Sequence, residues 1–381
     1  MKRVQAMVLF ALLVSKGGAA GWSQPITPSG PITAALYNLY AYWLDGVVPS
    51  GASVNVLIEG PQIVKGLDTI IEDDIAGGLQ LNDFYRNPDR SLYSGPNGTP
   101  AVFGQAEFLN DFGIRQGLLW SSESKRNLLE AFLFYRAHFD YDFPAPGNPN
   151  PLILDSNFPD KVEILSNALH AGLSYDSLVK DKVHKTRDGI YVEASAEWGP
   201  RFLLNSDGQA DYYRLNGTVE GFKTLYASPP AGQENRFSIY LADYFSADYA
   251  GGSSIPFSVF ESFGGRYMRT SVGTTIRGFE NGRFGADFKV LNNFDVRLTG
   301  PSIISNDLVP GLYAFFDAEY YDGFFDDPSN TPGGLLASTG FGAYLNVCDF
   351  LSITMYAAFP FEGRRLDGSQ MVLGGGLMLL Y

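Results

Sequence analysis

The stretch Leu128-Leu-Glu-Ala-Phe-Leu-Phe-Tyr-Arg-Ala-His-Phe-Asp-Tyr-Asp-Phe143 decides the fold of this chain. Its odd-numbered residues from Leu129 to Phe143 are all apolar or aromatic, and most of its even-numbered residues carry charge or can titrate. Such a period of two predicts a β-strand with two different faces. Ordinary strands average about 5–6 residues and tilted membrane-crossing strands about 9–11. This run exceeds both lengths, which favours a transmembrane β-barrel.

The same alternation returns along the chain, at residues 190–198, 213–221 and 351–357. The last residues, 371–381, place Leu377, Leu379 and the terminal Tyr381 on one face, as expected for a closing strand that ends at a membrane interface. We therefore predict an all-β fold, a transmembrane antiparallel β-barrel of about 16 strands of ~10 residues each. A secreted β-sandwich or jelly roll, whose strands also alternate, is the alternative.

The composition excludes several function classes. The formal charge of −14 leaves no basic surface for nucleic acid. The single cysteine, Cys348, and three histidines that lie far apart exclude a structural zinc site of the usual Cys/His kind. Acidic clusters such as residues 72–74 are expected to be solvated loops, with calcium binding the alternative. We expect no cofactor and no metal.

Enzyme motifs are absent from the sequence. It contains no nucleophile elbow, no phosphate-binding loop and no His-Glu-x-x-His helix. His138 or His170 next to an aspartate would be the base of an alternative, enzymatic function, but no nucleophile is paired with either. We therefore expect that the protein is not an enzyme.

The N-terminus has the layout of a secretory signal peptide. Lys2 and Arg3 precede an apolar run from Val4 to Val14, and small residues follow at 17–21. We expect cleavage after Ala20 or Gly21, with a buried N-terminal helix the alternative. Residues 21–381 would then form the barrel in a bacterial-type outer membrane. Residues 21–99 are the least well assigned part, and residues 37–44 fit either a short helix or the first strand.

Three motifs follow one another near the C-terminus. Ile276-Arg277-Gly278-Phe279 is the first, Phe316-Asp-Ala-Glu319 the second, and Ser338-Thr-Gly340-Phe-Gly342 the third. Their order and spacing resemble the BamA-like surface-antigen superfamily of outer-membrane barrels, over residues 263–381. The resemblance implies a barrel with an inward-folded lid loop that carries the Arg-Gly-aromatic motif.

The resemblance also implies roles for single residues. Arg277 would pair with acidic groups on the inner wall, for which Asp317 and Asp295 are the candidates. Glu319 stands where the family has glycine, and would be an additional lumenal partner. Gly278 would allow a tight turn, and Phe279 would pack on the wall.

The family's periplasmic polypeptide-transport-associated (POTRA) domains are not expected here, because the barrel alone uses up the length. Residues 22–99 are long enough for one such domain, but their proline and glycine spacing argues against it.

Three functions remain open. The resemblance implies insertion or transport of protein or lipid at the outer membrane, with a weak seam between the first and last strands. Partners would be outer-membrane lipid, client outer-membrane proteins or a periplasmic accessory protein. The alternative is a passive, cation-preferring pore or a structural surface antigen. A soluble secreted binding module ranks third.

Overall fold

A computed structural model describes residues 33–44, 47–64, 68–84, 102–121, 126–144, 163–181, 186–205, 210–229, 237–266, 276–279, 286–304, 307–322, 334–348, 351–361 and 369–379. Within these residues the chain forms 15 strands and one short helix, α2 (Phe257–Glu261). No helix in these ranges is long and apolar enough to cross a membrane.

The strands run along the chain with few interruptions. Their bounds are β1 (Thr33–Leu44), β2 (Val47–Val64), β3 (Thr69–Phe84), β4 (Val102–Ser121), β5 (Arg126–Pro144), β6 (Glu163–Asp176), β7 (Val179–Asp181), β8 (Thr186–Gly199), β9 (Asp211–Ala227), β10 (Ser238–Ser254), β11 (Phe288–Thr299), β12 (Leu308–Asp322), β13 (Gly334–Val347), β14 (Leu351–Pro360) and β15 (Val372–Leu379).

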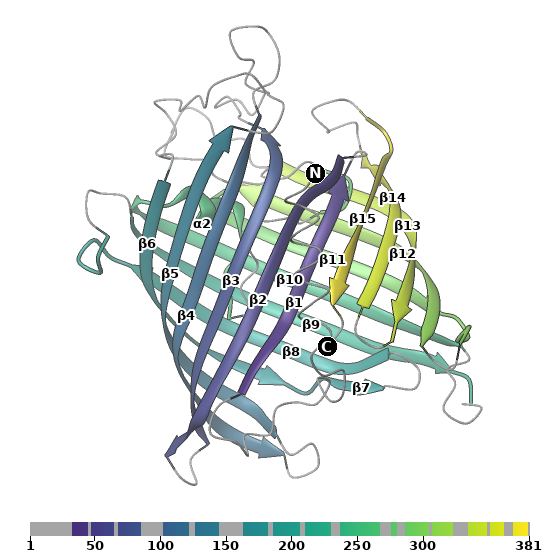
Figure 1. The fold of residues 1–381 in the computed structure, drawn as a ribbon, viewed down its shortest axis with the longest axis horizontal. Helices are drawn as coiled ribbons and strands as arrows, with labels where there is room; N and C mark the ends of the chain where they lie inside the picture. Colours follow the sequence, from purple (N-terminus) through teal and green to yellow (C-terminus); the bar gives the residue numbers. More distant parts are fainter. Residues whose placement is uncertain are drawn as a thin grey trace, which may run out of the picture.

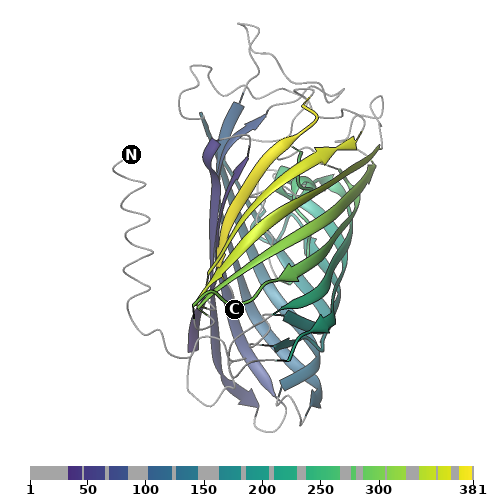
Figure 2. The same ribbon diagram turned by 90° about the vertical axis from the view of Figure 1, so that its right-hand side faces the viewer.

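The sheet closes on itself. Consecutive strands pair antiparallel except at β6, which pairs with β8 instead of β7, and β1 also pairs with β15. Fourteen of the described strands therefore form a ring, and the three-residue β7, which pairs with β8, lies outside it. Figures 1 and 2 show the resulting tilted barrel, with β15 beside β1. The expected barrel is confirmed, but its expected number of 16 strands is wrong. The wall strands run from 8 to 20 residues, and several far exceed the ten residues assumed for each.

The two faces of the wall have opposite chemistry. Along β5 the even-numbered residues from Glu130 to Asp142 are buried inside the barrel, whereas Leu133, Phe139 and Tyr141 are exposed on its outer surface. The other strands repeat this arrangement, with outward residues such as Phe112 and Leu215. An apolar outside around a polar inside is the pattern of a barrel in lipid, and it excludes the sandwich alternative.

The N-terminal region is part of the wall. Residues 33–44 form β1, which settles the choice between helix and strand for residues 37–44, and residues 47–84 form β2 and β3. The described residues of the segment 22–99 therefore belong to the barrel rather than to a POTRA domain. The expected signal peptide, residues 1–20, lies outside the described residues.

The connections divide unequally between the two ends of the barrel. Because neighbouring strands are antiparallel, the long connections 85–101, 145–162 and 255–287 all leave from the end toward which β1 runs. Short connections such as 65–68 and 122–125 leave from the opposite end. Outer-membrane barrels have longer loops outside and shorter turns in the periplasm.

The outer face provides a test of membrane burial. Val219 lies at the centre of β9 on the outer surface, and Leu225 lies on the same surface near the end of that strand. We expect Val219→Arg to cost about 2–4 kcal/mol of unfolding free energy and Leu225→Arg about 0–1 kcal/mol, because the cost of a charge depends on depth in the bilayer. Urea unfolding in phospholipid vesicles measures both. Equal, small effects would contradict burial of this face in lipid.

Candidate functional site: a loop clamped inside the barrel

The connection between β10 and β11, residues 255–287, enters the barrel. Its described residues Ile276 and Phe279 are fully buried. They pack with inward side chains of three wall strands, Leu291 of β11, Tyr321 of β12 and Leu336 of β13. We call residues 255–287 the lumenal loop, because its described parts occupy the interior of the barrel.

Arg277 attaches the lumenal loop to β11 and β12. Its Nε donates to Asp317 Oδ2 at 2.8 Å and its Nη2 to Asp317 Oδ1 at 2.6 Å, which is a bidentate pair. The same Nη2 donates to Asp295 Oδ1 at 2.6 Å, and the backbone N–H of Arg277 donates to Asp317 Oδ2 at 3.0 Å. Burial lowers the pKa of Arg277, but the attraction of Asp317 and Asp295 outweighs this and raises the pKa above its ordinary value. The Arg277 guanidinium is therefore charged throughout the physiological range, and we call Arg277 with its partners Asp317 and Asp295 the clamp.

The guanidinium also stacks on an aromatic floor. Its carbon lies 3.9 Å from the centroid of the Phe315 ring and 5.8 Å from that of Tyr313. Stacking and bidentate pairing together use the planar shape of arginine, so lysine is not an equivalent substitute.

The third motif makes room for this floor. On β13, Gly340 pairs with Phe315 and Gly342 with Tyr313. A Cβ at Gly340 would lie 2.5 Å from the Phe315 ring, and one at Gly342 would lie 2.5 Å from the Tyr313 ring. Both rings therefore lie against bare backbone. Ser338, on the same inner face, donates from its Oγ to the Arg277 carbonyl at 2.6 Å.

Gly278 occupies the turn of the lumenal loop. Its φ of +95° is one that other residues rarely adopt, and a Cβ there would lie 2.8 Å from the Cβ of Ala358 on β14. Both the conformation and the space therefore require glycine.

The remaining predicted residues are divided between the two faces. Asp295, Asp317 and Glu319 are buried on the inner wall. Phe316, by contrast, is exposed on the outer surface and has no place in the clamp. On β15, Leu377 points outward, Leu379 belongs to the strand, and Tyr381 lies outside the described residues.

A second arginine holds the lumenal loop to the opposite wall. Arg266 Nη1 lies 2.8 Å from Glu130 Oε2 of β5, and its Nη2 lies 3.2 Å from Glu72 Oε2 of β3. Its backbone N–H donates to Glu193 Oε1 of β8 at 2.8 Å. Arg115 of β4 shares Glu72 and Glu130 with Arg266, at 2.6 and 2.8 Å. Loop and wall therefore form one buried network of charges.

The beginning of the lumenal loop is held through its backbone. Lys289 of β11 donates to the carbonyls of Val259 and Ser262, at 3.2 and 2.6 Å. Arg214 of β9 donates to the same Val259 carbonyl at 3.0 Å and to Ser262 Oγ at 3.0 Å. These contacts fix α2 and the turn that follows it against the wall.

Sequence reasoning missed part of this site. Ser338 begins the third motif, and Phe315 directly precedes the second at a position where strand alternation places it on the inner face, so their roles were accessible. Arg266 was not, because its partners on β3, β5 and β8 are separated from it in the chain and no motif joins them.

Comparisons with known proteins agree with the fold. No protein-family model and no curated sequence matches this chain. Among solved structures, CdiB from Acinetobacter baumannii is similar, with a TM-score of 0.51 and 9% identity over 92% of this chain and 60% of that one. CdiB from Escherichia coli gives a TM-score of 0.52 and 12% identity over 92% and 63%. BamA from Haemophilus ducreyi lacking POTRA domains 1–3 gives 0.43 and 15% over 91% and 70%.

The chain has the fold of the two CdiB structures. It spans less than two thirds of the length of the two CdiB chains. At these identities the similarity describes the arrangement of the strands, and it agrees with the resemblance that the three motifs indicate.

The clamp predicts how the lumen conducts ions. Removing one partner of a buried ion pair costs about 3–5 kcal/mol, so Arg277→Ala should release this end of the lumenal loop. In planar bilayers we expect small, flickering currents from the original protein and large, cation-selective ones from the variant. Arg201→Ala, which changes an exposed arginine, is the control. Identical currents from all three proteins would contradict a clamped loop.

The aromatic floor predicts that larger currents also result when Arg277 is kept but the ring beneath it is displaced. Gly340→Leu should displace the Phe315 ring and give larger currents than the original protein without any change of charge. Ala343→Leu, on the outer face of the same strand, should leave the currents unchanged. If both variants conduct like the original, the floor does not support Arg277.

Proposed function

We propose that this chain is an outer-membrane barrel that aids the insertion or transport of protein or lipid. The observation that carries the proposal is the seam between β1 and β15. Among the described residues it has five residue pairs, from Tyr40 with Met378 to Leu44 with Gly374. Other pairs of wall strands have more, with eight pairs between β14 and β15 and eight between β6 and β8. Within the part of the chain that the structure describes, the ring therefore has its fewest paired residues where its first and last strands meet.

Glycines weaken the seam further. Gly374, Gly375 and Gly376 form the middle of β15, and strand glycines contribute no side chain to packing. Gly375 lies under the ring of Trp43, which a Cβ there would overlap. The ring of Tyr40 lies beside Gly376 and that of Tyr356 beside Gly374, so flat aromatic rings cover the bare backbone of this part of β15.

The lumenal loop supports a lateral route. A passive pore needs an open lumen, whereas here a loop held by Arg266 and Arg277 joins opposite walls. A substrate that reaches lipid by separation of β1 from β15 does not need that loop to leave. Outer-membrane lipid at the seam and client proteins, with or without a periplasmic accessory protein, are the partners that this proposal requires.

The unequal ends of the barrel support an orientation. With the short connections in the periplasm and the long ones outside, β1 begins and β15 ends on the periplasmic side. An N-terminal signal peptide over residues 1–20 is consistent with export to this membrane.

A second function, a cation-preferring pore, is favoured by the charge of the inner wall. On the described strands, buried carboxylates outnumber buried basic side chains. The buried carboxylates are those of Glu59, Glu72, Asp74, Glu107, Asp111, Glu130, Asp140, Asp142, Glu193, Glu197, Asp248, Asp295, Asp317 and Glu319. Such a wall favours cations wherever the loop permits flow.

Disulfides across the seam test the first function. Ala41 pairs with Leu377 and Tyr42 with Gly376. Because hydrogen-bonded and non-hydrogen-bonded pairs alternate, these two double-cysteine variants sample both geometries. Each variant also carries Cys348→Ser and replaces the original protein in the bacterium that produces it. We expect oxidation of these cells to lower the outer-membrane content of barrel proteins or lipid. Reduction should restore it.

The matched controls place the same crosslinks between β13 and β14, two strands with more paired residues than the seam. Ala343 with Met355 and Tyr344 with Thr354 join β13 to β14. Crosslinking these pairs should have no effect. If the oxidised seam also has no effect while Arg277→Ala conducts cations strongly, the pore is the function and the assembly proposal is wrong.

A further inference from the structure

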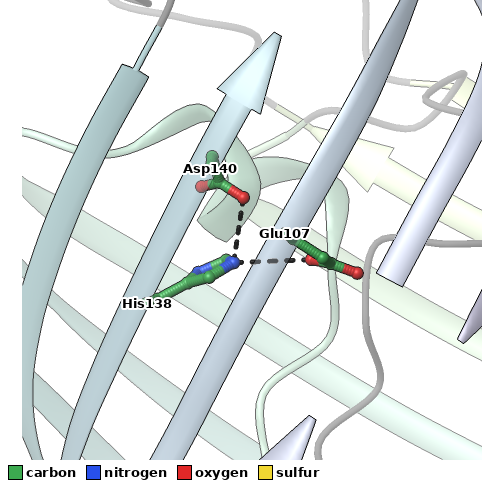
Figure 3. Close-up of side chains that lie close together, drawn as sticks. All are labelled: Glu107, His138 and Asp140. Atoms are coloured by element: carbon green, nitrogen blue, oxygen red, sulfur yellow. Dashed lines mark ion pairs between the residues drawn. The ribbon is translucent and has the colours of Figure 1, made fainter. Parts of the chain in front are cut away.

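Three titratable side chains meet on the inner wall, away from the two arginine anchors. Glu107 of β4 is the direct cross-strand partner of Asp140 of β5, and His138 precedes Asp140 on the same face of β5. Figure 3 shows the imidazole of His138 pointing toward both carboxylates. Like charges placed directly opposite each other on neighbouring strands are destabilising, so this pair needs a cation.

The ligand atoms converge on one place. His138 Nε2 lies 2.9 Å from Asp140 Oδ1 and 3.4 Å from Glu107 Oε2, and the three atoms lie within 4.8 Å of one another. All three residues are buried, with His138 only 9% exposed. Neither His138 Nε2 nor Asp140 Oδ1 makes a contact with the geometry of a hydrogen bond within the described residues. Either a metal ion between these atoms or a proton on His138 accounts for their close approach.

The distances fit coordination of a metal. Zinc binds imidazole nitrogen and carboxylate oxygen at about 2.0–2.2 Å, which separates neighbouring ligand atoms by about 3.4 Å in a tetrahedron and about 2.9 Å in an octahedron. The distance of 3.4 Å to Glu107 Oε2 corresponds to the tetrahedral separation and that of 2.9 Å to Asp140 Oδ1 to the octahedral one, so an ion with a single geometry requires a small rotation of one side chain.

We propose that Glu107, His138 and Asp140 bind one divalent transition-metal ion of the zinc class. An imidazole ligand favours such ions over magnesium and calcium, which prefer oxygen alone. Three protein ligands leave at least one position for water. Small residues flank the site, since Gly78 of β3 pairs with Glu107 and Ser166 of β6 pairs with His138.

This proposal departs from the expectation of no metal that was drawn from the sequence, which excluded a structural zinc site. That exclusion concerned sets of cysteines and histidines, whereas this set contains one histidine and two carboxylates from neighbouring strands. The inference rests on the wall itself and is independent of the proposed function. The other arrangement that satisfies the geometry is a protonated His138 shared by both carboxylates, without a metal.

Zinc binding to the refolded full-length barrel tests the proposal. After treatment with a chelator and its removal, zinc is titrated in competition with a chromophoric chelator, and bound zinc is counted by elemental analysis. We expect one tightly bound ion per chain and an increase in Tm on its addition. Cobalt in place of zinc should give visible absorption bands, while excess magnesium or calcium should not displace either ion.

Variants locate the ion. His138→Gln and Asp140→Asn should each lower the zinc affinity by roughly 100-fold or more. His170→Gln is the matched control, because His170 is also buried on the inner wall but lies beside Arg136 and Asp111. Heat-dependent mobility on gels verifies folding of each variant. The proposal is overturned if the original protein binds no zinc, or if the affinity is the same in all variants.

Discussion

A strand in hydrocarbon has no water to satisfy its backbone, so each wall strand must find a partner on both sides. The pairings of β1 with β15 and of β6 with β8 meet this requirement, because they leave no edge in the ring. Closure then decides the rest. One face of each strand meets lipid and is apolar, while the other faces a narrow interior. A loop that enters this interior displaces water, so the charged groups of the loop must pair with charged groups of the wall.

The alternation of β5 and β9 could be predicted from the sequence because lipid and lumen differ strongly in polarity. The polarity of each residue therefore indicates which face of the strand it lies on. The pairing of Arg277 with Asp317 and Asp295 was accessible through motifs that lie close in the chain. Contacts between distant strands were not. Glu107 meets Asp140, and Arg266 meets Glu72, only after the register of several strands is set. The number of strands was also inaccessible, since alternation reveals a strand's presence more reliably than its length.

Glycines on the wall have a shared role that composition alone conceals. Gly340, Gly342 and Gly374 each lie directly against an aromatic ring of a neighbouring strand, Phe315, Tyr313 and Tyr356 respectively. A flat ring covers the bare backbone, which keeps the wall thin where the lumenal loop must fit. At Gly340 and Gly342 the same rings then support the guanidinium of Arg277. Packing and electrostatics therefore depend on the same two positions.

Two arginines of the lumenal loop hold it at separate places, Arg277 on β11 and β12 and Arg266 on β3, β5 and β8, while wall residues hold its beginning at α2. The two anchors share no carboxylate among these contacts. Each arginine can therefore detach without the other, so removal of the loop proceeds in separate steps. After the first step the loop remains tethered to one wall, so its return is an intramolecular event and the sealed state is the one that re-forms fastest.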